Sequence, residues 1–167
     1  MIIIGVDPGY AIVGLGVIDY KGNKFRMLEY NALTTEAGEK TTNRLKYISD
    51  GMDYYIKKYK PDAIAIEELF FNSNQKTAIK VAQARGVILL SAVKNGVPVY
   101  EYTPLQVKQA VTGYGRADKN QIQTMVKMML HLDKIPKPDD AADGLALAIC
   151  HAHSSRMNSI GGQDLSI

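Results

Sequence analysis

Acidic residues directly follow two of the short apolar runs in this 167-residue chain. Asp7 comes after the run Ile2–Val6, and Glu67 comes after the run Asp62–Ile66. Runs of this kind form the central strands of a sheet. An acidic residue that directly follows such a run is therefore expected at the end of the strand. For Asp7 alone, which Pro8-Gly9 follows, a role in capping its own turn is an equally good interpretation. The repetition of the pattern favours a chemical role.

A second pair of acids, Asp140 and Asp143, falls on the final predicted helix. Residues three apart share one helix face, and Leu147 and Cys150 continue that face toward a core. Neither acid has a Lys or Arg four residues further on, so the pair is predicted to be unpaired unless a cation joins it. Asp139, directly before them, is interpreted as the N-cap of the helix.

If that helix crosses the strand ends, four carboxylates converge, and such a cluster repels itself without a cation. The four are Asp7, Glu67, Asp140 and Asp143. Oxygen ligands without imidazole suit Mg²⁺ or Mn²⁺. Two such ions roughly 4 Å apart can activate water and stabilise the leaving oxygen in phosphodiester cleavage. The sequence contains no Walker A motif, no GxGxxG motif, and no Ser–His–acid or Cys–His pattern that competes for the chemistry.

The elements that must position these acids follow from the apolar periodicity. Three strands of an antiparallel meander are predicted over 2–6, 11–19 and 24–33, then a helix over 42–59 and a strand over 62–66. A helix over 77–94, a strand over 97–102 and three further helices follow, the last over 139–152. This order implies an α/β fold with a mixed five-stranded sheet and helices on both faces. We expect one domain over 1–153 and a flexible tail over 154–167.

Several residues define these elements more closely. Gly14 and Gly16 lie on one face of their strand, which indicates either a close approach to the backbone or a bend, with equal weight. Pro98 argues for an edge strand. Capping boxes are predicted to begin two of the helices, at Thr103 and at Asp118.

The composition excludes several classes of protein. Charged residues make up 22% and hydrophobic residues 46%, which are ordinary globular values. A single cysteine, Cys150, excludes a disulfide framework and a cysteine-rich zinc site. The sequence shows no membrane span and no signal peptide, so a cytoplasmic protein is the expectation.

Charge is unevenly distributed. Residues 74–134 contain nine basic and three acidic residues, a net charge of +6, while the remainder carries −3. Binding of a polyanion is one interpretation and a solvated basic face the other. Arg116 and Lys119, at a Gly-rich loop and a helix start, are candidates for phosphate contact. One of the adjacent aromatics Phe70 and Phe71 is a candidate for stacking on a base, with core packing as the alternative.

In this order and spacing, the motifs resemble those of the bacterial RuvC Holliday-junction resolvases, in the RNase H-like nuclease superfamily. The matching stretches, between Met1 and about His153, are GVDPG, AIEELF, QARG, VKQAVTGYGRADKNQ and DDAADGLALAICHAH. The resemblance implies a Mg²⁺-dependent endonuclease that nicks four-way DNA junctions in symmetric pairs. Two Mg²⁺ ions per site are expected, with Mn²⁺ as a possible substitute.

The resemblance also implies particular residues. Asp7, Glu67, Asp140 and Asp143 match the metal-binding catalytic acids, with Glu67 preferred to Glu68 by the family's I-E-x-x-F pattern. Further matches are Phe70 near the junction centre, and Lys108 and Lys119 as contacts to the scissile region or its phosphates. Gly144 departs from the family, which usually has alanine there.

Symmetric incision needs two active sites, so a homodimer is expected, with the helix over 77–94 as the candidate contact. The implied partners are four-way junction DNA and the RuvA and RuvB branch-migration proteins. The sequence also suggests two other functions. An actin-like phosphotransferase is suggested by D-P-G-Y-A-I-V-G, but the chain is too short for its two domains. A junction-binding module without activity would not need the acids.

Overall fold

A computed structural model of the chain describes residues 1–69 and 75–161. Five strands form one mixed sheet in the order β3-β2-β1-β4-β5. Their bounds are β1 Ile2–Asp7, β2 Ile12–Lys21, β3 Lys24–Thr34, β4 Ala63–Glu67 and β5 Val99–Tyr102. β1, β2 and β3 are the predicted antiparallel meander, while β4 runs parallel to both β1 and β5. The predicted fold class is therefore confirmed, and Pro98 directly precedes the edge strand β5, as expected.

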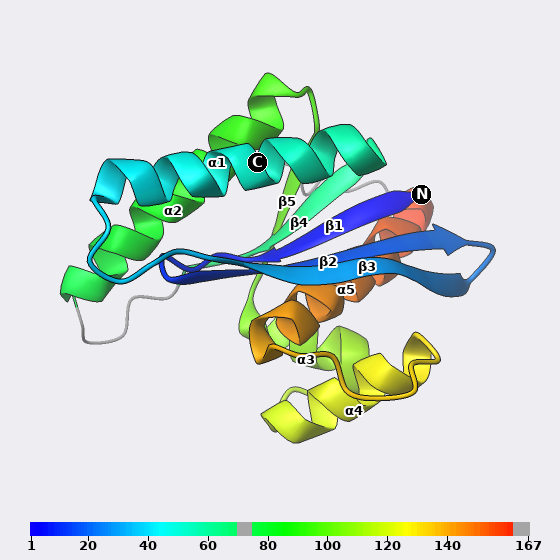
Figure 1. Cartoon of the computed structure of the whole chain (residues 1–167). Coiled ribbons are helices and arrows are strands. Elements are labelled where there is room, and N and C mark those ends of the chain that lie inside the picture. Colours follow the sequence, from blue (N-terminus) through cyan, green and yellow to red (C-terminus); the bar gives the residue numbers. More distant parts are fainter. Residues whose placement is uncertain (70–74, 162–167) are drawn as a thin grey trace.

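Helices cover both faces of this sheet (Figure 1). Two helices, α1 Thr41–Tyr59 and α2 Gln75–Lys94, lie on one face. Three helices, α3 Pro104–Thr112, α4 Lys119–Met129 and α5 Asp139–Gly161, form the layer on the other. No helix in the described parts of the chain is long and apolar enough to cross a bilayer.

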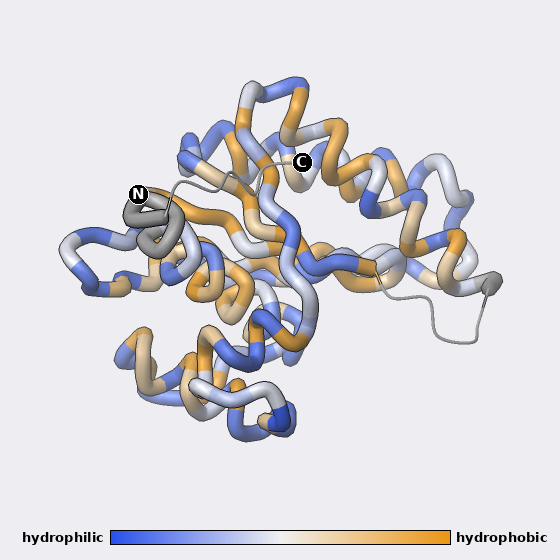
Figure 2. Tube along the Cα trace, turned by 180° about the vertical axis from the view of Figure 1, so that it is seen from behind, coloured by the Kyte–Doolittle hydropathy of each residue, from blue (hydrophilic) through white to orange (hydrophobic). Residues whose placement is uncertain are grey.

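Two hydrophobic cores result, one on each side of the sheet. Alternate residues of β1 enter different cores: Ile4 and Val6 face α1 and α2, while Ile3 faces α5. In β4, Ile64 and Ile66 join the first core and Ala65 joins the second. Hydrophobic residues follow the central strands, and many of the connecting turns are hydrophilic (Figure 2). The alternation decides which side chain at each strand end faces α5.

α5 lies directly against the backbone of β1 and β2, because glycines face it. A Cβ on Gly5 would lie 1.9 Å from the carbonyl oxygen of Gly144, and one on Gly16 would lie 2.3 Å from the backbone nitrogen of Leu145. Of the two interpretations of Gly14 and Gly16, close approach to the backbone is therefore correct, and the neighbour is α5.

We expect Gly16→Ala to lower the free energy of unfolding by about 1–3 kcal/mol or more, because the added methyl meets backbone atoms that cannot move aside. Gly115→Ala is the matched control, since a Cβ there meets the side chain of the exposed Leu105, which can move. Urea denaturation of both variants measures the difference. Equal stability of the two variants would contradict the tight packing of α5 on the sheet.

The local sequence signals at helix ends are largely confirmed. Thr103 and Asp118 form the predicted capping boxes with Gln106 and Gln121. α5, however, continues to Gly161, beyond the predicted end at Ala152. Two serines just beyond the predicted end bond their hydroxyl groups to carbonyls of the same helix. Ser154 Oγ donates to the Cys150 carbonyl and Ser155 Oγ to the Ala152 carbonyl, each at 3.0 Å.

Candidate active site

The parallel pairing of β1 and β4 places the first two candidate acids side by side. Val6 is the register partner of Ile66, so Asp7 and Glu67 are the next residues of the two neighbouring strands. Both follow the alternation of Ile3 and Ala65 and therefore face α5. By the same alternation Glu68 faces the other way, which agrees with the preference for Glu67.

α5 begins directly over these strand ends. A Cβ on Gly14 would lie 2.9 Å from Cβ of Asp140, and Gly14 is the cross-strand partner of Asp7. Asp143 lies one turn further along α5, and its charge acts on both Asp7 and Glu67. The spatial condition set by the sequence is met: the last helix starts at the ends of the first and fourth strands.

A cation joins Asp143, which is the condition under which the sequence analysis expected the acid pair not to be left unpaired. Lys119, the first residue of α4, places its Nζ 3.2 Å from Oδ2 of Asp143. The cation comes from another helix in this layer, which the spacing of residues within α5 does not indicate.

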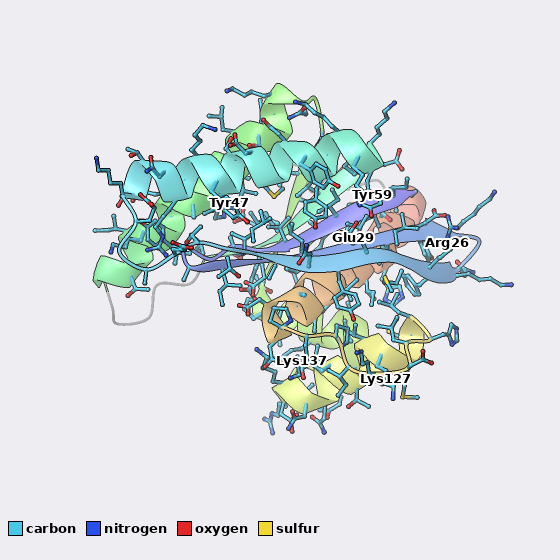
Figure 3. All side chains as sticks on the ribbon, in the orientation of Figure 1. Arg26, Glu29, Tyr47, Tyr59, Lys127 and Lys137 are labelled. Carbon is cyan, nitrogen blue, oxygen red and sulfur yellow. The ribbon has the colours of Figure 1, made fainter. Side chains whose placement is uncertain are left out.

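The interpretation of Asp139 as an N-cap is also wrong. Asp139 is the first residue of α5, and its carboxylate lies 2.6 Å from Lys137 Nζ and 3.6 Å from Lys119 Nζ. Figure 3 shows Lys137 in the connection that leads into α5. Lys119 is thus held by two carboxylates, a contact that sequence analysis missed and that no local signal indicates.

The electrostatics of the site reflect crowded negative charge. The pKa of Asp7 is raised from 3.8 to about 7, first by burial and then by the charges of Glu67, Asp143 and Asp140, against a smaller opposing effect of Lys119. Burial also raises the pKa of Glu67, with Asp143 adding to the effect. The pKa of Asp143 is raised by burial despite the opposing effect of Lys119. One lysine therefore does not neutralise the cluster.

The donor set fits a hard divalent cation. All four side chains offer carboxylate oxygens, which are the ligands that Mg²⁺ prefers. Within residues 1–69 and 75–161, no group of three or more acidic, histidine or cysteine side chains is already arranged around a single point as a metal site. Repulsion among the carboxylates opposes such an arrangement in the absence of a cation. Burial and, after it, the neighbouring carboxylates raise the pKa of Asp7, so its charged form is disfavoured without a cation.

The candidate DNA-binding residues come from different elements. Lys108 is half-buried on α3, and Arg116 is exposed in the loop before α4. Neither forms an ion pair with a residue in the described part of the chain. Phe70 lies outside the described residues.

This sheet, with acids at the ends of β1 and β4 beneath the start of α5, defines a nuclease of the RNase H-like fold. A sequence model of the family "Crossover junction endodeoxyribonuclease RuvC" matches residues 3–151. The chain belongs to this family.

Close relatives and solved structures support the assignment over nearly the full length. The RuvC of Clostridioides difficile is 58% identical, with 98% of this chain and 99% of the relative covered. The RuvC of Ruminiclostridium cellulolyticum is 57% identical over 98% of this chain and 99% of the relative. The structure of Thermus thermophilus RuvC in complex with a Holliday junction substrate has a TM-score of 0.93 at 38% identity, covering 100% of this chain and 99% of that one.

The raised pKa of Asp7 predicts how metal binding depends on pH. Below about pH 7 this carboxyl is protonated in the folded protein, and a metal ion must displace that proton before the oxygen can bind it. We therefore expect Mn²⁺ affinity to fall about tenfold per pH unit below 7 and to level off above it. Titration of Mn²⁺ followed by electron paramagnetic resonance at pH 5.5, 6.5 and 8 measures this. Equal affinity at all three values would contradict it.

Proposed function

We propose that this protein is a structure-selective endonuclease that resolves Holliday junctions by paired symmetric nicks, acting in recombination and repair. The observation that carries the proposal is the meeting of Asp7 and Glu67 with the start of α5, in a chain of the RuvC family. A relative with the same fold, from Thermus thermophilus, is described in complex with a Holliday junction substrate.

In this proposal Asp7, Glu67, Asp140 and Asp143 hold two Mg²⁺ ions, which Mn²⁺ can replace. Bound metal supplies an activated water and stabilises the leaving oxygen of the phosphodiester. The sheet fixes Asp7 and Glu67, and the glycine contacts fix α5 and hence the two aspartates. Lys119 neutralises part of the charge on Asp143 and presents an ammonium group toward the phosphate at the mouth of the site.

DNA outside the cleavage site contacts the basic part of the chain. Lys108 and Arg116 come from α3 and the following loop, in the same helical layer as Lys119. Such lysines and arginines bind phosphates and fix the position of the DNA without reading its sequence. Phe70 is proposed to contact the junction centre.

α2 offers the surface for a homodimer. Its inner face places Ala84, Ile88 and Ala92 in the hydrophobic core between α2 and the sheet. Its outer face is apolar as well: Ile79, Leu90 and Val93 are 61%, 53% and 71% exposed. These three positions share one side of the helix, and a matching helix from a second copy would cover them. The second subunit supplies the second active site for symmetric incision.

Placing a charge on this outer face should separate the subunits. We expect Leu90→Glu to weaken self-association at least about tenfold, because a carboxylate would be buried without a partner. Sedimentation velocity measures the association. Met128→Glu is the control, since Met128 is 61% exposed on α4, away from α2. Unchanged association of the Leu90 variant would remove α2 from the interface.

RuvA and RuvB, the branch-migration proteins, are the proposed partners, by the resemblance to the family, and the cytoplasm is the proposed location. A pull-down with purified RuvA and RuvB in the presence of junction DNA tests the first of these. Recovery of neither protein would contradict the partnership without affecting the proposed chemistry.

The deciding experiment is cleavage of a synthetic four-way junction with Mg²⁺, beside a linear duplex of one arm. Paired nicks in symmetric strands of the junction, with the duplex left intact, are the expected result. Binding without cleavage would favour a junction-binding module, and ATP turnover independent of DNA would favour a phosphotransferase.

A further inference from the structure

A pocket of about 400 Å³ adjoins the candidate active site. It lies between the β1–β2 turn and the first turns of α2, and Asp140 forms part of its wall. The turn contributes Gly9 to Ile12, and α2 contributes Thr77, Lys80 and Val81. Anything bound there lies next to a carboxylate of the acidic cluster.

The turn beside this pocket is held rigidly from behind. The Tyr10 carbonyl accepts hydrogen bonds from Thr35 Oγ1 at 2.7 Å and Arg44 Nη2 at 3.3 Å. The guanidinium of Arg44 also stacks on the Tyr10 ring, 3.9 Å from its centre, and the Tyr10 hydroxyl donates to Thr41 Oγ1. The carbonyl of Ala11 accepts from the Thr35 N–H. The wall of the pocket is therefore formed before any ligand binds.

The chemistry of the lining suits a sugar–phosphate backbone. Lys80 is exposed, with its Nζ 5.4 Å from the centre of the Tyr10 ring, and forms no ion pair within the described parts of the chain. The N–H groups of Tyr10 and Ala11 donate no hydrogen bond to a described residue. Ala11, Ile12 and Val81 provide an apolar surface beside these donors. A lysine and hydrogen-bond donors next to apolar groups can hold a phosphate and its neighbouring deoxyribose together.

We propose that this pocket binds a phosphodiester of the strand being cut, within one to three nucleotides of the scissile one. The inference rests on the proposed endonuclease function and deepens it. A polymeric substrate must continue past the cleavage site, and this pocket begins at Asp140. Lys80 supplies the positive charge that opposes repulsion from Asp140, and the rigid turn fixes the register of the strand. D-P-G-Y-A-I-V-G is then a phosphate-binding turn that serves DNA rather than a nucleotide.

The test combines a protein variant with a modified substrate. In EDTA, where no strand is cut, Lys80→Ala should weaken junction binding and reduce the slope of log K against log salt by about one. Lys24→Ala is the matched control, because Lys24 is an exposed lysine in the hairpin turn at the opposite end of the sheet. Junctions that carry one neutral methylphosphonate at successive positions near the cut site then locate the contact.

With wild-type protein, one of these methylphosphonates should weaken binding, and with Lys80→Ala the same modification should have no further effect. Equal responses of the two proteins at every position, or a Lys80→Ala variant that behaves like Lys24→Ala, would overturn the inference. Cleavage by the wild-type protein is a separate observation. If the wild-type protein does not cleave the junction, the proposed function fails. If it cleaves the junction but Lys80→Ala does not change junction binding, only this inference fails.

Discussion

Asp7→Asn should reduce junction cleavage at least about a thousandfold, because asparagine keeps the size of the side chain but loses the charge that holds a metal ion. Asp7 is the centre of the cluster: Glu67, Asp143, Asp140 and Lys119 all act on its charge. Removing this carboxylate removes the proposed metal ligand at the end of β1.

The same substitution should stabilise the metal-free protein. Because the folded pKa of Asp7 is raised to about 7, its ionised form costs stability as the pH rises through that value. In EDTA at pH 8, Asp7→Asn should therefore have a higher Tm than the wild type, and it should lose the increase in Tm that Mg²⁺ produces. Junction binding in EDTA should not weaken, since the variant carries one negative charge fewer.

Asp50→Asn is the control for these measurements, because Asp50 is exposed on α1 and pairs with Lys46 at 2.6 Å. It should cut junctions as the wild type does. Cleavage by Asp7→Asn at the wild-type rate would contradict the proposed metal-dependent nuclease activity. A loss of cleavage together with a lower Tm in EDTA would instead indicate a damaged fold.

The adjacent acids Glu67 and Glu68 provide a second prediction with its own control. Glu67→Gln should lower cleavage at least about a hundredfold, because it removes a proposed metal ligand that neighbours Asp7. Glu68→Gln should change cleavage by less than about threefold, because neighbouring side chains of a strand point to opposite faces. The two variants carry the same substitution at adjacent positions and are identical in composition.

Single-turnover cleavage rates at saturating protein measure this contrast, and the Mg²⁺ concentration that gives half the maximal rate should rise for Glu67→Gln alone. Equal losses of cleavage rate in both variants would show that Glu67 and Glu68 do not face opposite sides of the sheet at the end of β4. A larger loss for Glu68→Gln would reassign the ligand and the register of β4.

Much of the site could be predicted because its signals are local in the sequence. An apolar run followed by an acid identifies a strand end, and a three-residue spacing identifies one helix face. The capping boxes at Thr103 and Asp118 were predicted for the same reason, since their partners lie three residues away. The position of Gly14 and Gly16 on one face indicated close packing but not the element that packs there.

Apart from the end of α5, which lies at Gly161 and not at Ala152, what the sequence left open or got wrong concerns contacts beyond one helix or strand. No local signal pairs Asp143 with Lys119, because the lysine belongs to a different helix, and the interpretation of Asp139 as a cap is wrong because its carboxylate pairs with Lys119 and Lys137. The apolar composition of α2 is compatible with burial inside this chain and with contact to a second copy of the chain, and the sequence does not distinguish the two. Ile79, Leu90 and Val93 are exposed on one side of the helix, which agrees with contact to a second copy there.

The sequence by itself determined the element order, the acids at the strand ends and the family, because each depends on residue types at short, fixed spacings. Only the tertiary structure decided that Asp140 lies over Gly14, that Lys119 reaches Asp143, and that the turn at Tyr10 and Lys80 line a common pocket. Those contacts join residues that are distant along the chain. Their distances depend on how helices pack on the sheet, which no local pattern specifies.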